Sequence, residues 1–341
     1  MSIDAVDDHK AHKADDAAGA LHARAIMIDG ACPGIDAPRS WGSWAAGGAT
    51  VAAPTVALNE DSATTLRTIG RWFRWFREYE DELLHVTQVS DIDRAKQEGK
   101  LGILFHFQNS TALDRELDLL ETYHRLGVRM IQLCYNQRNA IGDGSFERTE
   151  CGLSTFGLRV IREMNRLGIV IDCAHSGERT SMEAVAASEK PVVISHANAR
   201  ALCDNRRNVS DELIKAVADS GGLIGVVAFP SFVRAEALKP TLDDLLNHVD
   251  HIAEHVGVDH VGIGNDFYDG GNEAVYAELL RIGEWETPDI PPCPHRYPVG
   301  IENAAKLPNV TAGLLGRGYP ESAVLKVLGG NWVRVFREVW G

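Results

Sequence analysis

Residues 152–175 read GLSTFGLRVIREMNRLGIVIDCAH, which is the pattern of a helix followed at once by a strand. Ser154 is a favourable N-cap, and the apolar residues after it recur three and four positions apart until Gly168 ends the pattern. The short apolar run 169–172 that follows has the length of a buried strand. A helix that leads directly into a strand predicts one repeat of a parallel βα fold.

The same alternation of short apolar runs and longer amphipathic stretches continues toward both ends of the chain. Eight runs predict strands, at residues 25–29, 49–56, 102–107, 130–134, 169–172, 192–195, 223–227 and 260–264. None of them alternates cleanly between apolar and polar residues, which indicates strands buried on both faces. We therefore expect an α/β protein with a single (β/α)8 barrel of the TIM type, spanning residues 1–341 as one domain.

Two segments are expected to lie outside the barrel itself. Residues 1–20 include five aspartates and no apolar run, so they predict a polar leader and not a signal peptide. Residues 269–308 are rich in proline and predict a long irregular loop after the eighth strand. A loop of that length favours a role as a lid or as a subunit contact.

Charge and cysteine content restrict the class of partner. The formal net charge of -14 argues against a nucleic-acid partner and against an anionic membrane surface. No run reaches the roughly 20 apolar residues that span a bilayer. The six cysteines form no Cys-x-x-Cys pair, so we expect reduced thiols and not a disulfide framework. These features predict a cytoplasmic protein that acts on a small molecule.

Polar residues stand at the ends of three predicted strands. The fifth strand is followed by His175, the sixth by His196 and the eighth by Asp266. In a (β/α)8 barrel the carboxyl ends of the strands meet at one mouth, where the chemistry of such barrels takes place. Each residue alone is commonly structural, but two imidazoles and a carboxylate at one mouth predict a site for a zinc-class ion.

From about residue 99 to residue 340 the chain resembles the membrane (renal) dipeptidase family of zinc metallopeptidases, a branch of the amidohydrolase-type barrels. The matching segments are 152–175, PVVISHANAR (191–200), RRNVSDELIKAVADSGGLIGV (206–226), HVGIGNDFYDG (260–270) and LKVLGGNWVRVF (325–336). The resemblance implies that His175 and His196 bind one zinc. It further implies that Asp266 binds a second zinc and shuttles protons, that Arg207 clamps the carboxylate of the substrate, and that the protein is a homodimer.

The chain departs from this family at three groups. Family members end their first strand with Asp-Gly-His-x-Asp, whereas residues 29–33 here read Asp-Gly-Ala-Cys-Pro. The glutamate that bridges two zincs aligns with Gln108, and the histidine that polarises the scissile carbonyl aligns with Tyr135. A neutral amide cannot balance two divalent cations as a carboxylate does, so we expect one zinc ion and not two.

The mononuclear zinc site would use the two histidines and a third ligand. The candidates for that ligand are Gln108, Asp266 and the thiols of Cys32 and Cys134. The metal identity and the number of ions are otherwise open at this point.

These residues predict the metal-assisted hydrolysis of a small carboxylate-bearing amide or dipeptide by an activated water. Asp266 would move the proton, Tyr135 would donate a hydrogen bond to the oxyanion, and Arg207 would bind the carboxylate. For Arg207, a structural role beside the helix expected to start at residue 211 is the alternative. Two other functions stay open: a hydrolase or lyase for a non-peptide amino-acid derivative, and a non-catalytic relative that binds a small acid.

Overall fold

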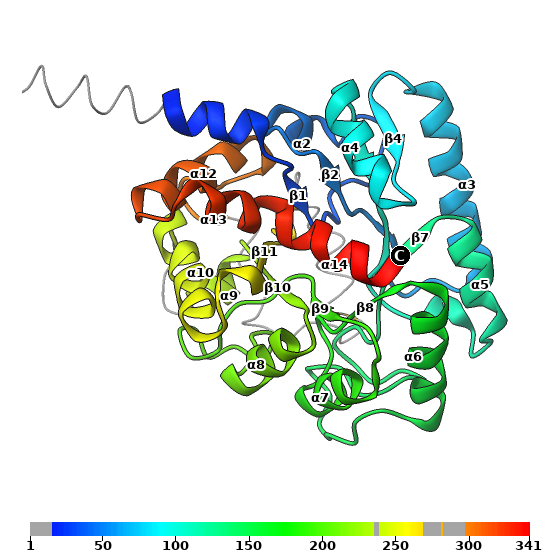
Figure 1. Ribbon diagram of the computed structural model, residues 1–341. Helices are drawn as coiled ribbons and strands as arrows, with labels where there is room; N and C mark the ends of the chain where they lie inside the picture. Colours follow the sequence, from blue (N-terminus) through cyan, green and yellow to red (C-terminus); the bar gives the residue numbers. More distant parts are fainter. Residues whose placement is uncertain (1–15, 235–238, 269–280, 282–296) are drawn as a thin grey trace, which may run out of the picture.

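Figure 1 shows the computed structural model, which describes residues 16–234, 239–268, 281 and 297–341. Parallel strands surround a central axis and helices cover them on the outside, which confirms the predicted (β/α)8 barrel. Each of the eight predicted runs contains strand residues. The barrel strands are β1 (Ile28–Asp29), β2 (Val51–Ala52) with β3 (Thr55–Ala57), β5 (Leu101–Ile103) with β6 (Phe105–Phe107), β7 (Val128–Gln132), β8 (Val170–Asp172), β9 (Val192–Ile194), β10 (Leu223–Val226) and β11 (Val261–Ile263).

Two sheets share the barrel wall. One has the order β11-β10-β9-β8-β7-β6-β3 and the other has the order β1-β2-β5-β4, and every pair is parallel. The sheets are continuous because β2 runs into β3 and β5 runs into β6 along the chain. The wall closes between β1 and β11, where Gly30 N donates to Ile263 O at 2.9 Å and Asp266 N donates to Ala31 O at 3.0 Å.

Among the described residues, one strand lies outside the eight predicted runs. Strand β4 (Leu83–His85) pairs with β5 between helices α3 (Ser62–Glu78) and α4 (Val89–Glu98). Because β4 is only three residues long and follows an amphipathic helix closely, its sequence carries no separate periodicity.

The repeat 152–175 folds as its sequence predicts. Helix α6 (Thr155–Leu167) begins after Ser154, whose side chain accepts a hydrogen bond from Gly157 N, and it ends at Gly168 in the left-handed region with φ 72°. Further helices in the described part of the chain are α2 (Gly42–Ala46), α5 (Asp118–Arg125), α7 (Glu178–Ala187), α8 (Asp211–Asp219), α9 (Pro230–Val233), α10 (Leu242–Val256), α12 (Leu307–Gly316), α13 (Glu321–Leu325) and α14 (Asn331–Trp340).

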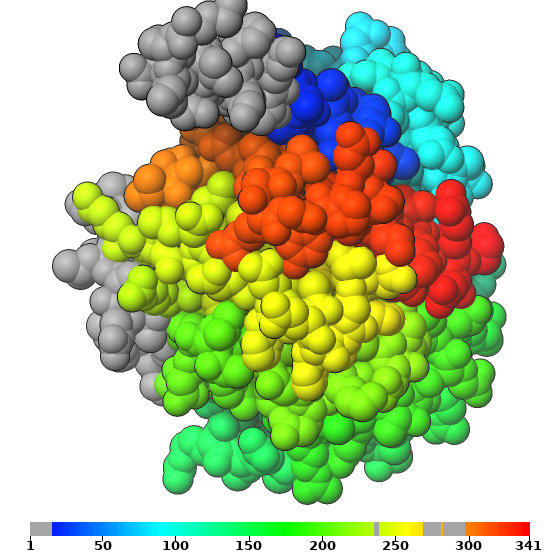
Figure 2. Space-filling model, turned by 60° about the vertical axis from the view of Figure 1, so that its left-hand side comes forward, coloured from blue at the N-terminus to red at the C-terminus, as the bar shows by residue number. Residues whose placement is uncertain are grey.

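The C-terminal helix α14 seals the end of the barrel opposite the candidate site. Trp332 and Phe336 of α14 belong to one buried cluster with residues at the starts of the barrel strands, among them Val170, Val193 and Leu223. Figure 2 shows the C-terminal segment, in orange and red, lying between the blue N-terminal segment and the yellow segment that contains α10. The apolar closure at this end leaves the carboxyl ends of the strands to form the site.

The predicted leader and the predicted loop fall largely on residues that are not described. Of the leader, residues 1–15 lie outside the described residues, and residues 16–24 are helical. Of the loop 269–308, residues 281 and 297–308 are described, and they include a 3-10 turn (Ala304–Lys306) and the start of α12. Among the described residues, no helix has both the length and the apolar character needed to cross a membrane.

Candidate metal site

The structure brings His175 and His196 together at the carboxyl ends of β8 and β9. Both side chains are buried, and their Nε2 atoms lie 2.9 Å apart. Two nitrogen ligands of a tetrahedral zinc are about 3.3 Å apart when each Zn–N bond is about 2.0–2.1 Å. The two Nε2 atoms therefore converge almost as closely as two ligands of one ion.

The other ring nitrogen of each histidine is held by an oxygen. His175 Nδ1 lies 2.6 Å from Asn136 Oδ1, and His196 Nδ1 lies 2.7 Å from Ser195 Oγ. The Ser195 hydroxyl in turn donates to Asp172 Oδ2 at 2.6 Å. Metal-binding histidines commonly donate their second N–H to such an oxygen, which fixes the tautomer and the ring orientation. The predictions from sequence did not include Asn136, Ser195 or Asp172.

Both imidazoles are held in the neutral form that a metal ligand requires. Burial lowers the pKa of His175 and of His196 well below the ordinary value, and the nearby Arg207 guanidinium lowers both further. When each Nδ1–H points at an oxygen, the Nε2 lone pairs of both rings are available to a single ion at the mouth of the barrel. The two imidazoles would thus supply two of the three or four protein ligands that a zinc-class cation takes.

The backbone at the site is strained. Asn136, His175 and Asp266 have positive φ values of 51°, 60° and 57°. Non-glycine residues in this region cost about 1–3 kcal/mol each and cluster at functional sites. At His175 the surrounding loop holds the strained turn, because Ser145 N donates to His175 O at 2.7 Å.

Asp266 and Gln108 interact with each other at the mouth. Burial raises the pKa of Asp266 to about 7, although Arg207 and a hydrogen bond from the Gln108 side chain act in the opposite direction. A carboxyl group that titrates near neutral pH can both take up and release a proton. In residues 16–234, 239–268, 281 and 297–341, no three His, Cys, Asp or Glu side chains are grouped to hold a metal. The ligand roles of Asp266 and Gln108 therefore stay predictions.

The thiols proposed as a third ligand are protonated and hydrogen-bonded. Burial raises the pKa of Cys32 and of Cys134 above the ordinary value of a thiol. Cys32 Sγ donates to Asp29 O at 3.3 Å, and Cys134 Sγ donates to Asn139 Oδ1 at 3.5 Å. The five cysteines that the structure describes are free thiols. These environments favour Gln108 or Asp266 over sulfur.

Tyr135 and Arg207 lie beside the two histidines. The Tyr135 ring stacks on the His175 ring with a centroid distance of 4.1 Å. Arg207 is buried, its Nη2 donates to His196 O at 3.4 Å, and its guanidinium lies 5.2 Å from the ring centroid of Phe232. Burial lowers the pKa of Arg207 to about 10, so it stays cationic at neutral pH. Its Nε has no hydrogen-bond partner among the described residues, which suits an anionic ligand.

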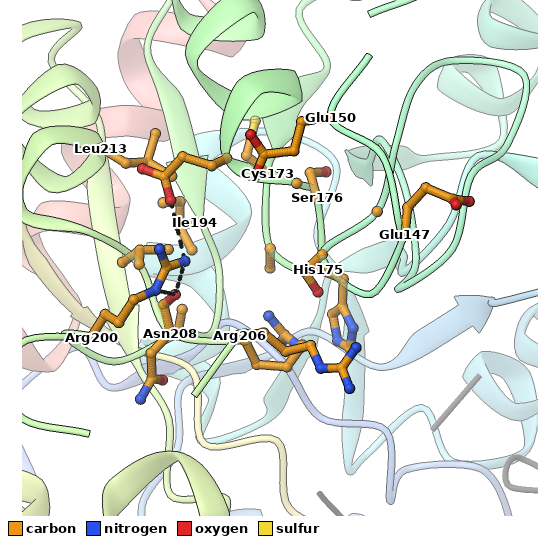
Figure 3. Close-up of a pocket in the computed structure, with 18 of the residues that line it drawn as sticks. Glu147, Glu150, Cys173, His175, Ser176, Ile194, Arg200, Arg206, Asn208 and Leu213 are labelled. Carbon is orange, nitrogen blue, oxygen red and sulfur yellow. Dashed lines mark hydrogen bonds and ion pairs between the residues drawn. The ribbon is translucent and has the colours of Figure 1, made fainter. Parts of the chain in front are cut away.

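A cavity of about 270 Å³ opens next to these side chains. Most of its lining comes from the segment after β7, the segment between β8 and α7 and the segment between β9 and α8, and it includes His175 and Arg207. Figure 3 shows His175 and Arg206 close together on one side of the cavity, and Arg200 on the opposite side bonded to Asn208. Arg200 Nη2 donates to Asn208 O at 2.7 Å. This volume suits a small molecule and not a polymer.

A parallel (β/α)8 barrel with two converging imidazoles at the carboxyl ends of its strands has the architecture of the amidohydrolase-type barrels. A family model described as membrane dipeptidase (peptidase family M19) matches residues 39–280 and 293–340. The chain therefore belongs to the membrane dipeptidase family.

Individual relatives agree with this assignment. The chain is 31% identical over 263 residues to a dipeptidase of Claviceps purpurea, which covers 76% of this chain and 56% of that protein. It is 30% identical over 257 residues to Dipeptidase 3 of Rattus norvegicus, which covers 74% of this chain and 48% of that protein. The chain thus spans about half the length of these curated relatives.

A solved structure covers nearly the whole chain. The crystal structure of an amidohydrolase from Pseudomonas aeruginosa is 37% identical and superposes with a TM-score of 0.90, covering 95% of this chain and 99% of that one.

Proposed function

We propose that this chain is a metal-dependent hydrolase that cleaves a small carboxylate-bearing amide or dipeptide at a mononuclear zinc site. The observation that carries the proposal is the pair of neutral imidazoles of His175 and His196, whose Nε2 atoms lie 2.9 Å apart with both Nδ1 atoms held by oxygens. Membership of the membrane dipeptidase family supports the reaction class.

His175 and His196 would hold the ion, and Gln108 or Asp266 would supply the third ligand. Zinc supplies a bound water whose pKa is about 7. The positions that carry the family's first-strand ligands are occupied by Ala31 and Pro33, which have no donor side chain. For that reason we propose one ion and not two.

The remaining steps belong to side chains at the mouth. Asp266 would take a proton from the attacking water and return it to the leaving nitrogen, a role that its raised pKa in the metal-free chain supports. Tyr135 donates its phenolic proton in a hydrogen bond to the developing oxyanion, a role for which a phenol can replace an imidazole. Arg207 binds the substrate carboxylate through its fork of N–H donors.

A second candidate function follows from Tyr135. A phenol donates a hydrogen bond at this position but does not carry protons near neutral pH as a histidine does. That difference favours a hydrolase or lyase acting on a non-peptide amino-acid derivative as the alternative. The Nε of Arg207, which has no hydrogen-bond partner in the part of the chain that the structure describes, also suits a non-catalytic protein that binds a small acid.

We also propose a cytoplasmic homodimer with no nucleic-acid or membrane partner. The net charge of -14 argues against nucleic-acid and anionic membrane partners. The free thiols of the five described cysteines support a cytoplasmic location. The dimer rests on the family resemblance alone, and the molecular mass in solution tests it.

Two measurements on the purified chain separate the three functions. Zinc titration followed by metal analysis should give one ion per chain, and zinc should raise the melting temperature. A panel of dipeptides and N-acylated amino acids should then show zinc-dependent turnover. Turnover of the acylated compounds alone would favour the alternative enzyme, whereas absence of stoichiometric zinc would leave only the binding protein.

A further inference from the structure

We propose that Asp172 and Ser195 are positioning residues for His196, which together keep the proton of its ring on Nδ1 and the lone pair on Nε2. This inference rests on the metal site proposed above, because a ligand nitrogen must be free of hydrogen. Neither residue is itself proposed to touch the ion or the substrate.

The hydrogen bonds that run from His196 Nδ1 through Ser195 Oγ to Asp172 Oδ2 are called the relay below. The contacts of Asp172 determine which atom donates in each of these bonds. Ala174 N and Ser195 N both donate to Asp172 Oδ1, each at 2.9 Å. Backbone N–H groups can only donate, so they fix this oxygen as an acceptor. The second oxygen, Oδ2, lies 3.0 Å from His106 Nε2 and 2.6 Å from Ser195 Oγ. The carboxylate therefore fills its acceptor capacity with fixed donors.

The bond from Ser195 to Asp172 determines which nitrogen of the His196 ring carries the hydrogen. A hydroxyl has one proton, and that proton is given to Asp172 Oδ2. The Ser195 oxygen must then accept in its other close contact, which is with His196 Nδ1 at 2.7 Å. It follows that His196 Nδ1 carries the hydrogen and that Nε2, 2.9 Å from His175 Nε2, carries the lone pair.

The relay is built into the barrel wall and shielded from water. Asp172, Ser195, His196 and His106 are all fully buried. Asp172 ends β8, Ser195 follows β9 and His106 lies on β6, so three elements of the wall fix the geometry. A prearranged donor chain of this kind costs little reorganisation when the ion binds, and loss of such partners commonly costs about 10–100-fold in metal affinity.

Asp172→Asn is the sharpest test. It keeps the size and shape of the side chain but replaces an acceptor oxygen with an NH2 donor, which reverses the donor and acceptor roles along the relay. The two backbone donors retain the amide oxygen at the Oδ1 position, which places the new NH2 group against Ser195 Oγ. The hydroxyl then accepts from this amide, and its own proton is released to point at His196 Nδ1, which favours the ring tautomer with the hydrogen on Nε2. The same logic explains how an aspartate-to-asparagine change selects the wrong tautomer in a serine protease triad.

The experiment records ¹⁵N chemical shifts of the His196 ring in the metal-free full-length chain, and then zinc affinity. The wild type should show the hydrogen on Nδ1, and Asp172→Asn should show it on Nε2 with zinc bound about 10–100-fold more weakly. Ser195→Ala should weaken zinc by a similar factor, whereas Ser195→Thr keeps the hydroxyl and should restore the affinity. Ser181→Ala is the matched control, since it removes a fully buried hydroxyl that donates to Gly177 O instead.

The outcomes separate this inference from the metal site. A wild-type His196 with its hydrogen on Nε2 would overturn the relay even if zinc binds. A wild type that binds no zinc would overturn the proposed function. The ¹⁵N shifts of the metal-free chain would still show which nitrogen of His196 carries the hydrogen, and so would still test the relay. Equal zinc affinity in Ser195→Ala and in the Ser181→Ala control would also count against the relay, and this comparison holds if Asp172→Asn fails to fold.

Discussion

The two sides of the barrel mouth use their polar residues for different purposes. On the β8–β9 side, His175 and His196 point their free nitrogens at each other across 2.9 Å. On the β1 side, the carboxylate of Asp29 accepts from Trp44 Nε1 at 3.0 Å and from Asn265 N at 2.8 Å. The buried Ala31 follows, at the position where the family resemblance predicts a histidine.

Under the proposed function, the β8–β9 side holds the metal and the β1 side holds the barrel closed. The histidine pair depends on partners from its own neighbourhood, namely Asn136 and Ser195. Asp29 instead joins β1 to the segment after β11, so its role is to close the barrel. We therefore expect substitutions on the β8–β9 side to remove the metal and substitutions on the β1 side to reduce stability.

The largest effect should come from His175→Ala or His196→Ala. Either change removes a nitrogen ligand, so the attacking water returns from a pKa of about 7 toward about 15.7, and turnover should fall by more than about a thousandfold. Metal analysis should find no stoichiometric zinc. His22→Gln is the matched control, because His22 is a buried histidine bonded to Thr311 and Gly47 in another part of the fold. Full activity in either alanine variant would contradict the assignment of the pair.

Asp266→Asn should abolish most of the turnover with zinc still bound. Removing a general acid–base group costs about 10²–10⁴-fold, and the amide retains the size of the carboxyl group. Steady-state kinetics and metal analysis on the same preparation check both parts. Loss of zinc in this variant would indicate that Asp266 is a metal ligand and would contradict a role limited to proton transfer.

The same variant should change the pH dependence of stability in the metal-free chain. The folded-state pKa of Asp266 is about 7, above the unfolded value of about 3.9, so the folded state binds this proton more tightly. The stabilisation from the proton is complete below pH 4 and is lost as the pH rises through 7, on the order of 4 kcal/mol. Urea unfolding at pH 4 and pH 8 should show a smaller decrease for Asp266→Asn than for the wild type. An identical decrease in both would show that the pKa is not raised.

On the β1 side, Asp29→Ala should cost stability and leave the metal in place. It removes the acceptor of Trp44 Nε1 and of two Asn265 donors in a fully buried site, which predicts a loss of about 3 kcal/mol. Denaturant unfolding measures the loss, and zinc should still bind at one ion per chain. An Asp29→Ala variant with normal stability but no bound zinc would contradict the assignment of metal binding to the β8–β9 side and of stability to the β1 side.

The smallest effect should be on substrate binding. Arg207→Lys keeps the charge but removes the planar fork, which predicts a rise in KM of about 10–100-fold for carboxylate-bearing substrates. The kcat should change little, and a carboxamide analogue should not distinguish the variant from the wild type. Arg129→Lys is the matched control, because the Arg129 guanidinium bonds backbone carbonyls such as Thr87 O. A rise in KM of equal size for the carboxamide analogue would assign Arg207 a structural role.

The sequence predicted the barrel because each of its strands is a short apolar run between helical stretches. It did not predict that β2–β3 and β5–β6 are each split, or that β4 pairs with β5, because those features depend on partners distant in the chain. The histidine pair could be predicted from its place after two strands. The relay could not, since a serine or an aspartate beside a strand end gives no sign of which side chain it will face.

The most direct test of the central claim is an anomalous difference map at the zinc edge from crystals of the zinc-loaded chain. The proposal predicts one peak, about 2.0–2.1 Å from Nε2 of both His175 and His196. Two peaks at the mouth would contradict the mononuclear site, and a mouth without a peak in the zinc-loaded crystals would contradict the metal-dependent function.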